Sequence, residues 1–163
     1  MPHKRTAPIT CKYSKSEQLY LILHCKQAQS GTPGTKMEHN ITTSGDGSST
    51  LQLTRFNETY HSRNGAYTEA SHIYIACGLD YLFKNGLAAD ARQASAGINV
   101  YDIGLGTALN CILAWCWQQH LIRCGKPYPQ IAYYGIEKYP IPPQEALQLN
   151  YPQVIARHLE NLT

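Results

Sequence analysis

The sequence predicts an α/β fold in which two buried strands run parallel and a helix connects them. The strands are predicted at residues 98–103 and 130–137, where Ile, Val and Tyr are frequent. Between them, a long helix is predicted from about Ala108 to Arg123, and Gly125 is expected to end it. A strand, a crossover helix and a parallel strand form the unit of nucleotide-binding sheets, so the chain is expected to form a partial Rossmann-like fold.

A β-hairpin and a short helix are predicted to precede this unit. Residues 41–53 read as two strands around a Gly-Asp-Gly turn. Thr68 is a suitable N-cap for a short helix that runs from Glu69 through Tyr74 and as far as Cys77, and Gly78 could end it. A second short helix is predicted near residues 79–83. Prolines that can open a helix follow the second parallel strand, at Pro142, Pro143 and Pro152.

Charge divides the chain into two parts. Residues 1–36 hold six Lys or Arg and one acidic residue, Glu17, whereas residues 37–163 hold eight basic and ten acidic residues. The apolar run at residues 19–23 is shorter than a signal peptide needs. Residues 1–36 are therefore predicted to be a disordered or spurious extension, and residues 37–163 to form one domain. Charge alone gives no reason to expect that this domain binds nucleic acid.

The six cysteines show no C-x-x-C pair and no His partner at metal-ligand spacing. Neither a metal site nor a disulfide framework is expected, and a reduced, cytoplasmic protein is the simplest interpretation. The chain also has no apolar run that is long enough to cross a membrane, so no membrane partner is expected.

The candidate cofactor site lies where the two predicted strands end. A dinucleotide-binding G-x-G-x-x-G turn would need a small residue at position 109, which is Leu. The small residues stand instead at Gly104, Gly106 and Ala108, close to the G-x-G-x-G turn of S-adenosylmethionine-dependent methyltransferases. A nicotinamide or flavin oxidoreductase is therefore the weaker alternative.

Polar side chains around this turn suit the same cofactor. Asp102 ends the first strand and would repel a phosphate, whereas S-adenosylmethionine carries an amino group and a sulfonium. Glu137 ends the second strand, and its carboxylate can accept hydrogen bonds from two ribose hydroxyls. Thr107 and Asn110 stand where the helix begins, so free N–H groups there are expected to face the ligand.

Three motifs resemble those of the bacterial tRNA (5-methylaminomethyl-2-thiouridine) methyltransferases. Residues 58–75 resemble the family's Tyr-x-Ser-x-x-x-Gly-x-x-Glu signature, residues 102–110 its E-I-G-F-G-T-G-L-N segment, and residues 134–140 its Glu-Lys-x-Pro motif. The resemblance spans about residues 37–150, with the motifs in the family's order. It implies a class I methyltransferase that moves a methyl group from S-adenosylmethionine to the aminomethyl nitrogen of a modified wobble uridine in tRNA.

The resemblance also implies roles for single residues. Those expected to line the cofactor are Asp102, Gly104, Gly106, Thr107, Ala108, Asn110 and Glu137. Those expected near the cofactor or its entrance are Tyr60, Ser62, Gly65 and Glu69. Ala108 stands where the family has its third glycine, and a positive φ there would cost about 1–2 kcal/mol.

No catalytic residue is assigned, because the family's Leu-Asp-Gly-Phe-x-Pro segment has no counterpart in the chain. The chain is therefore expected to be the N-terminal part of such an enzyme, with open sheet edges, a half-covered core and little activity of its own. Two alternatives stay open: a class I methyltransferase with another substrate, and a non-catalytic partial protein that binds the cofactor weakly.

Overall fold

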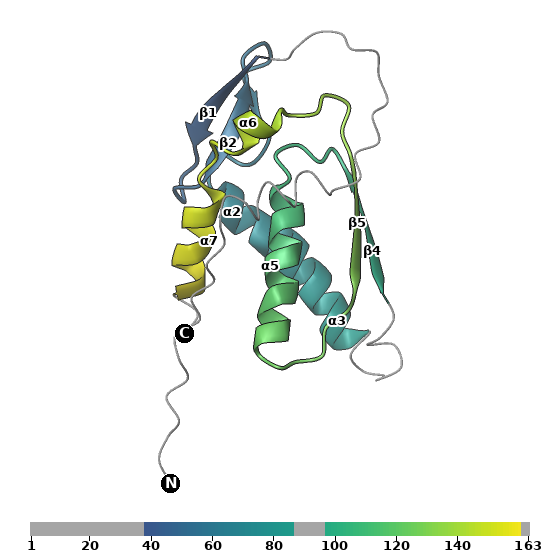
Figure 1. Ribbon diagram of the computed structural model, residues 1–163. Coiled ribbons are helices and arrows are strands. Elements are labelled where there is room, and N and C mark those ends of the chain that lie inside the picture. The colour runs from purple at the N-terminus through teal and green to yellow at the C-terminus, as the bar shows by residue number, and fades with distance from the viewer. Residues whose placement is uncertain (1–37, 87–96, 161–163) are drawn as a thin grey trace.

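The computed structural model describes residues 38–86 and 97–160 (Figure 1). The extension predicted at residues 1–36 lies outside the described residues. None of the helices in the described ranges is both long and apolar enough to cross a membrane.

The predicted hairpin is confirmed. Strands β1 (His39–Thr43) and β2 (Ser49–Leu53) pair antiparallel, so that His39 faces Leu53 and Thr43 faces Ser49. A third, two-residue strand, β3 (Glu58–Thr59), adds to the far edge of β2. The Gly-Asp-Gly turn therefore stands at one end of a small three-stranded sheet.

The helix after the hairpin is longer than predicted. Helix α2 (Ala66–Ala70) continues without a break into η1 (Ser71–Asp80), whose turns are π-helical, and then into α3 (Tyr81–Asn85). The prediction that the helix begins at Glu69 and ends before Gly78 is wrong at both ends, and the second helix predicted near residues 79–83 is the continuation of the same helix. Gly65 is the N-cap, and Gly78 lies inside η1.

The early start of α2 has a tertiary cause. The N–H groups of residues 66, 67 and 68 donate to Ser44 Oγ, Ser48 Oγ and Asp46 Oδ2 at 3.1, 3.0 and 2.8 Å. A helix leaves these first N–H groups without partners of its own. The turn of the hairpin supplies the partners, so the helix begins before the local N-cap signal at Thr68.

The predicted parallel unit is confirmed, and with it the α/β class. Strands β4 (Ile98–Ile103) and β5 (Ile131–Ile136) pair in parallel, and α5 (Leu109–Arg123) connects them. Gly125 has a φ of 62° and follows α5, as expected for a glycine that ends a helix. Figure 1 shows the two strands side by side, with α5 lying along them.

The face of this two-stranded sheet that points away from α5 is open. Tyr101 and Ile103 are 67% and 82% exposed, and the Tyr101 ring stacks on Tyr134 with the ring centres 5.0 Å apart. Parallel sheets are ordinarily covered on both faces. Within the described residues only one face is covered, which fits a partial Rossmann-like fold.

Two more helices return the chain to the hairpin. They are α6 (Pro143–Ala146) and α7 (Tyr151–Glu160). Between them, Asn150 accepts a hydrogen bond from the Ser49 N–H at 2.7 Å and donates one to the Gly47 carbonyl at 2.8 Å. The segment between α6 and α7 is thus hydrogen-bonded to the turn of the hairpin.

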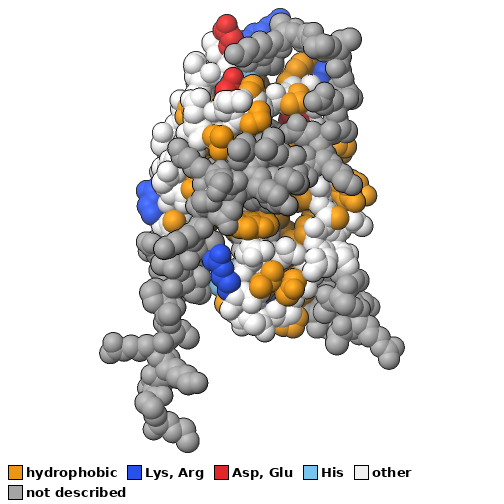
Figure 2. All heavy atoms as spheres, in the orientation of Figure 1, with side chains coloured by type: hydrophobic (Ala, Val, Ile, Leu, Met, Phe, Trp, Pro, Cys, Tyr) orange, Lys and Arg blue, Asp and Glu red, His pale blue; other side chains and the backbone are white. Residues whose placement is uncertain are grey.

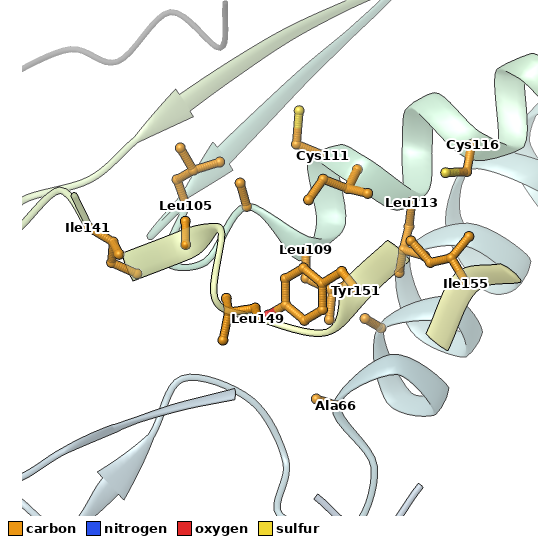
Figure 3. Close-up of a cluster of buried hydrophobic side chains, with 14 of the residues drawn as sticks. Ala66, Leu105, Leu109, Cys111, Leu113, Cys116, Ile141, Leu149, Tyr151 and Ile155 are labelled. Carbon is orange, nitrogen blue, oxygen red and sulfur yellow. The ribbon is translucent and has the colours of Figure 1, made fainter. Parts of the chain in front are cut away.

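One core joins α2, α5, α6, α7 and the hairpin. Figure 3 shows the Tyr151 ring beside Leu109 and Leu149, with Ile155 on the next turn of α7. The largest fully buried apolar side chains of the described residues are Leu51, Leu109, Ile112, Leu149, Tyr151, Val154 and Ile155. Figure 2 shows Lys and Arg side chains scattered over one face of the described surface and not gathered into a patch.

Candidate cofactor-binding site

The glycine turn joins β4 to α5 in left-handed backbone conformations. The φ angles are 88° at Gly104, 54° at Gly106 and 62° at Ala108. The N–H groups of Gly104 and Leu105 both donate to the Ile136 carbonyl, at 2.8 and 3.1 Å. The turn therefore folds over the end of β5 and meets the residue that follows it, Glu137.

Ala108 has a strained backbone, because an alanine here adopts a left-handed conformation. It is the N-cap of α5, is 4% exposed, and has a φ at which a Cβ costs about 1–2 kcal/mol. The glycine that the family has at this position would carry no such cost.

Ala108→Gly is therefore expected to raise the free energy of unfolding or leave it unchanged, because relief of the backbone strain offsets the lost methyl group. The matched control is Ala114→Gly, which removes an equally buried methyl from the middle of α5. The control should lose about 1–2 kcal/mol. Urea unfolding of both variants measures the difference, and an equal loss in both would contradict it.

Glu137 is bound to the glycine turn itself. Its carboxylate is buried, with Oε2 accepting the Gly106 N–H and Oε1 accepting the Tyr139 N–H, both at 2.9 Å. Each carboxylate oxygen can accept a further hydrogen bond. Two backbone donors thus hold the side chain at the end of β5 and leave it able to accept from a ligand.

Asp102 belongs to a polar group next to the turn. Tyr133 donates its hydroxyl to Asp102 Oδ2 at 2.6 Å, and Asn110 also bonds to this carboxyl. Burial raises the pKa of Asp102, the two hydrogen bonds lower it, and the charge of Glu137 raises it, so that the pKa lies above its ordinary value. The buried Asn110 Oδ1 accepts no hydrogen bond within the described residues.

Asp102, Tyr133 and Asn110 help to line a cavity of about 420 Å³ between η1 and β4. Its other walls are mostly apolar and include Ile73, Leu79 and Val100. An apolar cavity with a few convergent polar groups is the usual form of a small-molecule site.

Thr107 lies behind the turn. It is 1% exposed, its Oγ1 accepts the Tyr151 hydroxyl at 2.6 Å, and it lies 2.7 Å from His61 Nε2. Burial lowers the pKa of His61 to about 4, against a smaller raising effect from the charge of Glu69. The Thr107 side chain therefore ties the turn to α7 and to the loop after β3.

The ring of Tyr60 packs against the glycine turn at Gly106. A Cβ built on Gly106 would lie 2.8 Å from Tyr60 Cδ1, so the glycine allows the ring to approach. The Tyr60 hydroxyl lies 3.3 Å from His39 Nε2. Burial, and then the charges of Glu137 and Glu145, raise the pKa of Tyr60.

No protein-family model matches the chain, but two curated relatives do. Both are tRNA 5-methylaminomethyl-2-thiouridine biosynthesis bifunctional proteins MnmC. The protein from Burkholderia multivorans is 28% identical over 92 residues, which is 56% of this chain and 12% of the relative. The protein from Ralstonia nicotianae is 26% identical over 87 residues, which is 53% of this chain and 11% of the relative. The resemblance to the tRNA 5-methylaminomethyl-2-thiouridine family is confirmed.

A solved structure is also similar, the crystal structure of MNMC2 from Aquifex aeolicus. It is 21% identical, with a TM-score of 0.49, and the match covers 91% of this chain and 43% of that one. The chain thus corresponds to a small part of its MnmC relatives and to less than half of the MNMC2 chain.

The family-like signature at residues 58–75 is spread out in space. Tyr60 touches the turn, whereas Ser62 Oγ accepts the Asn64 N–H at 3.2 Å within its own loop. Gly65 packs on Asp46, since a Cβ there would lie 2.9 Å from the carboxylate, and Glu69 is exposed on α2. The contacts of Gly65 give it a packing role, and cofactor contact for it stays a prediction.

Sequence reasoning did not assign a role to several residues that hold the site. The contact of Tyr133 with Asp102 could have been predicted. Side chains alternate between the two faces along a strand, and this alternation puts Tyr133 of β5 on the same face of the sheet as Asp102 of β4. Tyr151, His39 and Glu145 carry no local signal, because their partners lie far away in the chain.

Within residues 38–86 and 97–160, no three His, Cys, Asp or Glu side chains are grouped so that they could hold a metal ion. None of the four cysteines in these ranges, Cys77, Cys111, Cys116 and Cys124, forms a disulfide.

Proposed function

We propose that the chain binds S-adenosylmethionine at the glycine turn, as part of a cytoplasmic tRNA-modifying methyltransferase. One observation carries the proposal: the left-handed turn after β4 and the Glu137 carboxylate after β5 are joined by the Gly106 N–H. The turn and the carboxylate thus lie at the same edge of a parallel sheet, which is where α/β folds of this kind bind such cofactors.

The residues present fit this cofactor. A Cβ on Gly104 would meet nothing within 4 Å, so the space beside the turn is open to a ligand. The unpartnered Asn110 Oδ1 offers an acceptor to a ligand N–H. Two acidic side chains, Asp102 and Glu137, favour a ligand with ammonium and sulfonium charges over a pyrophosphate.

In this proposal, Glu137 accepts the ribose hydroxyls, and the backbone at Gly104 and Gly106 lies against the ligand. When bound, S-adenosylmethionine supplies an activated methyl group. The acceptor amine must be neutral and aligned with that methyl group, so orientation matters more than a strong base. The proposed acceptor is the aminomethyl nitrogen of a modified wobble uridine in tRNA, as the family resemblance implies. The MnmC relatives, which are tRNA 5-methylaminomethyl-2-thiouridine biosynthesis proteins, support a tRNA substrate.

Binding of S-adenosylhomocysteine, measured by isothermal titration calorimetry, tests the cofactor. We expect Gly106→Ala to weaken binding at least tenfold, because the added Cβ meets the Tyr60 ring at 2.8 Å and φ is 54°. The control is Gly125→Ala, which has a φ of 62° but no atom within 4 Å of the new Cβ. It introduces similar backbone strain away from the turn, so it should bind as the unaltered chain does.

A thermal shift with NADH and none with S-adenosylhomocysteine would overturn the cofactor assignment in favour of an oxidoreductase. Equal losses of binding in Gly106→Ala and Gly125→Ala would mean that the turn acts only through stability.

A further inference from the structure

Three side chains linked by hydrogen bonds lie beside the glycine turn, and the proposal above gives this group no role. Glu145 Oε2 of α6 lies 3.2 Å from His39 Nδ1 of β1, and His39 Nε2 lies 3.3 Å from the Tyr60 hydroxyl. The His39 and Tyr60 rings meet edge to face, with centres 5.7 Å apart. The His39 side chain is 5% exposed and is therefore shielded from water, whereas the Glu145 side chain is 29% exposed.

The direction of these hydrogen bonds follows from chemistry. A carboxylate can only accept, so His39 Nδ1 carries a proton and donates it to Glu145, and a ring with this single proton has no proton on Nε2. His39 Nε2 is then an acceptor, and the Tyr60 hydroxyl must donate to it. The Tyr60 oxygen is left with lone pairs alone, so it can only accept a hydrogen bond from a ligand.

The surroundings of Tyr60 favour a cationic donor. The carboxylates of Glu137 and Glu145 are close enough to Tyr60 to raise its pKa, after the larger effect of burial. The ring edge lies against Gly106, at the turn where the cofactor is proposed to bind. A ligand ammonium would meet an acceptor oxygen in a region of negative potential.

We propose that Glu145 and His39 are positioning residues that keep the Tyr60 oxygen an acceptor for the ammonium group of the bound S-adenosyl cofactor. The inference rests on the proposed function, because it needs that cofactor at the turn. The inference predicts that the site selects ligands that carry an amino group. This selectivity would depend on His39 of β1 and Glu145 of α6, which lie 106 positions apart in the sequence.

Two ligands separate this role from a structural one. S-adenosylhomocysteine carries the amino group, and 5′-deoxy-5′-methylthioadenosine has the same nucleoside and thioether without it. We expect Tyr60→Phe to weaken binding of the first about tenfold and to leave binding of the second unchanged. Glu145→Gln should act in the same direction, because a neutral amide accepts the His39 proton more weakly than a carboxylate and can also donate, so the direction of the hydrogen bonds is no longer fixed.

In the double variant, Glu145→Gln should add nothing to Tyr60→Phe, since both act on the same oxygen. Tyr81→Phe, which removes a hydroxyl from an exposed tyrosine of α3 outside the cavity, is the control and should bind both ligands normally.

The outcomes are distinct. Equal weakening of both ligands, or no weakening of either, overturns the inference but keeps the proposed cofactor. Failure of the unaltered chain to bind either ligand overturns the proposed function, and the inference with it.

Discussion

Asp46→Ala is expected to lower the free energy of unfolding by about 3 kcal/mol. The carboxylate accepts five hydrogen bonds: from the Ser44 hydroxyl, from the N–H and hydroxyl of Ser48, and from the N–H and hydroxyl of Thr68. Burial raises the pKa of Asp46, but these bonds outweigh it and hold the pKa below its ordinary value.

The effect of this substitution reaches beyond Asp46 itself. The two serine hydroxyls that donate to Asp46 also accept the N–H groups of Ala66 and Tyr67, so removal of the carboxylate loosens the whole start of α2. Urea unfolding gives the free energy, and amide exchange at residues 66–68 should become faster in the variant.

Two variants complete this test. Asp46→Asn keeps the shape and part of the acceptor capacity, so its loss should be intermediate. Glu58→Ala removes an exposed carboxylate from β3 and should change stability by less than about 0.5 kcal/mol. Equal stability of Asp46→Ala and Glu58→Ala would show that the capping contacts contribute nothing.

The second large effect is a loss of stability in mild acid that depends on His61. Its folded pKa of about 4 lies below the ordinary 6.5, because burial beside Thr107 disfavours the charged ring. Between these values the unfolded chain binds more protons than the folded chain. Burial of neutral His61 therefore contributes about 3 kcal/mol to the free energy of unfolding above pH 6.5. This contribution decreases as the pH falls below 6.5 and is lost at about pH 4.

Thermal unfolding between pH 7.5 and pH 4.5 measures this dependence. His61→Gln should start from a lower stability and should lose much less as the pH falls, because the titrating ring is gone. His72→Gln, at an exposed position of η1, should retain the full dependence on pH. The same slope in His61→Gln and the unaltered chain would exclude His61 as the cause.

The sequence by itself determined the hairpin, the two parallel strands, the connecting helix and the glycine turn. These features depend on local signals, because alternation, helical periodicity and glycines at 104, 106 and 125 act over a few residues. Placement of Glu137 opposite the turn also followed from the sequence, since parallel strands end at the same edge of a sheet.

Only the tertiary structure decided where α2 begins and what holds the turn. The N–H of Thr68 is capped from 22 residues away by Asp46, and Thr107 is held by His61 and Tyr151 at separations of 46 and 44 residues. Such partners leave no periodic trace in the chain. They are chosen by the packing of whole elements, since buried polar groups must be paired wherever the fold brings donors and acceptors together.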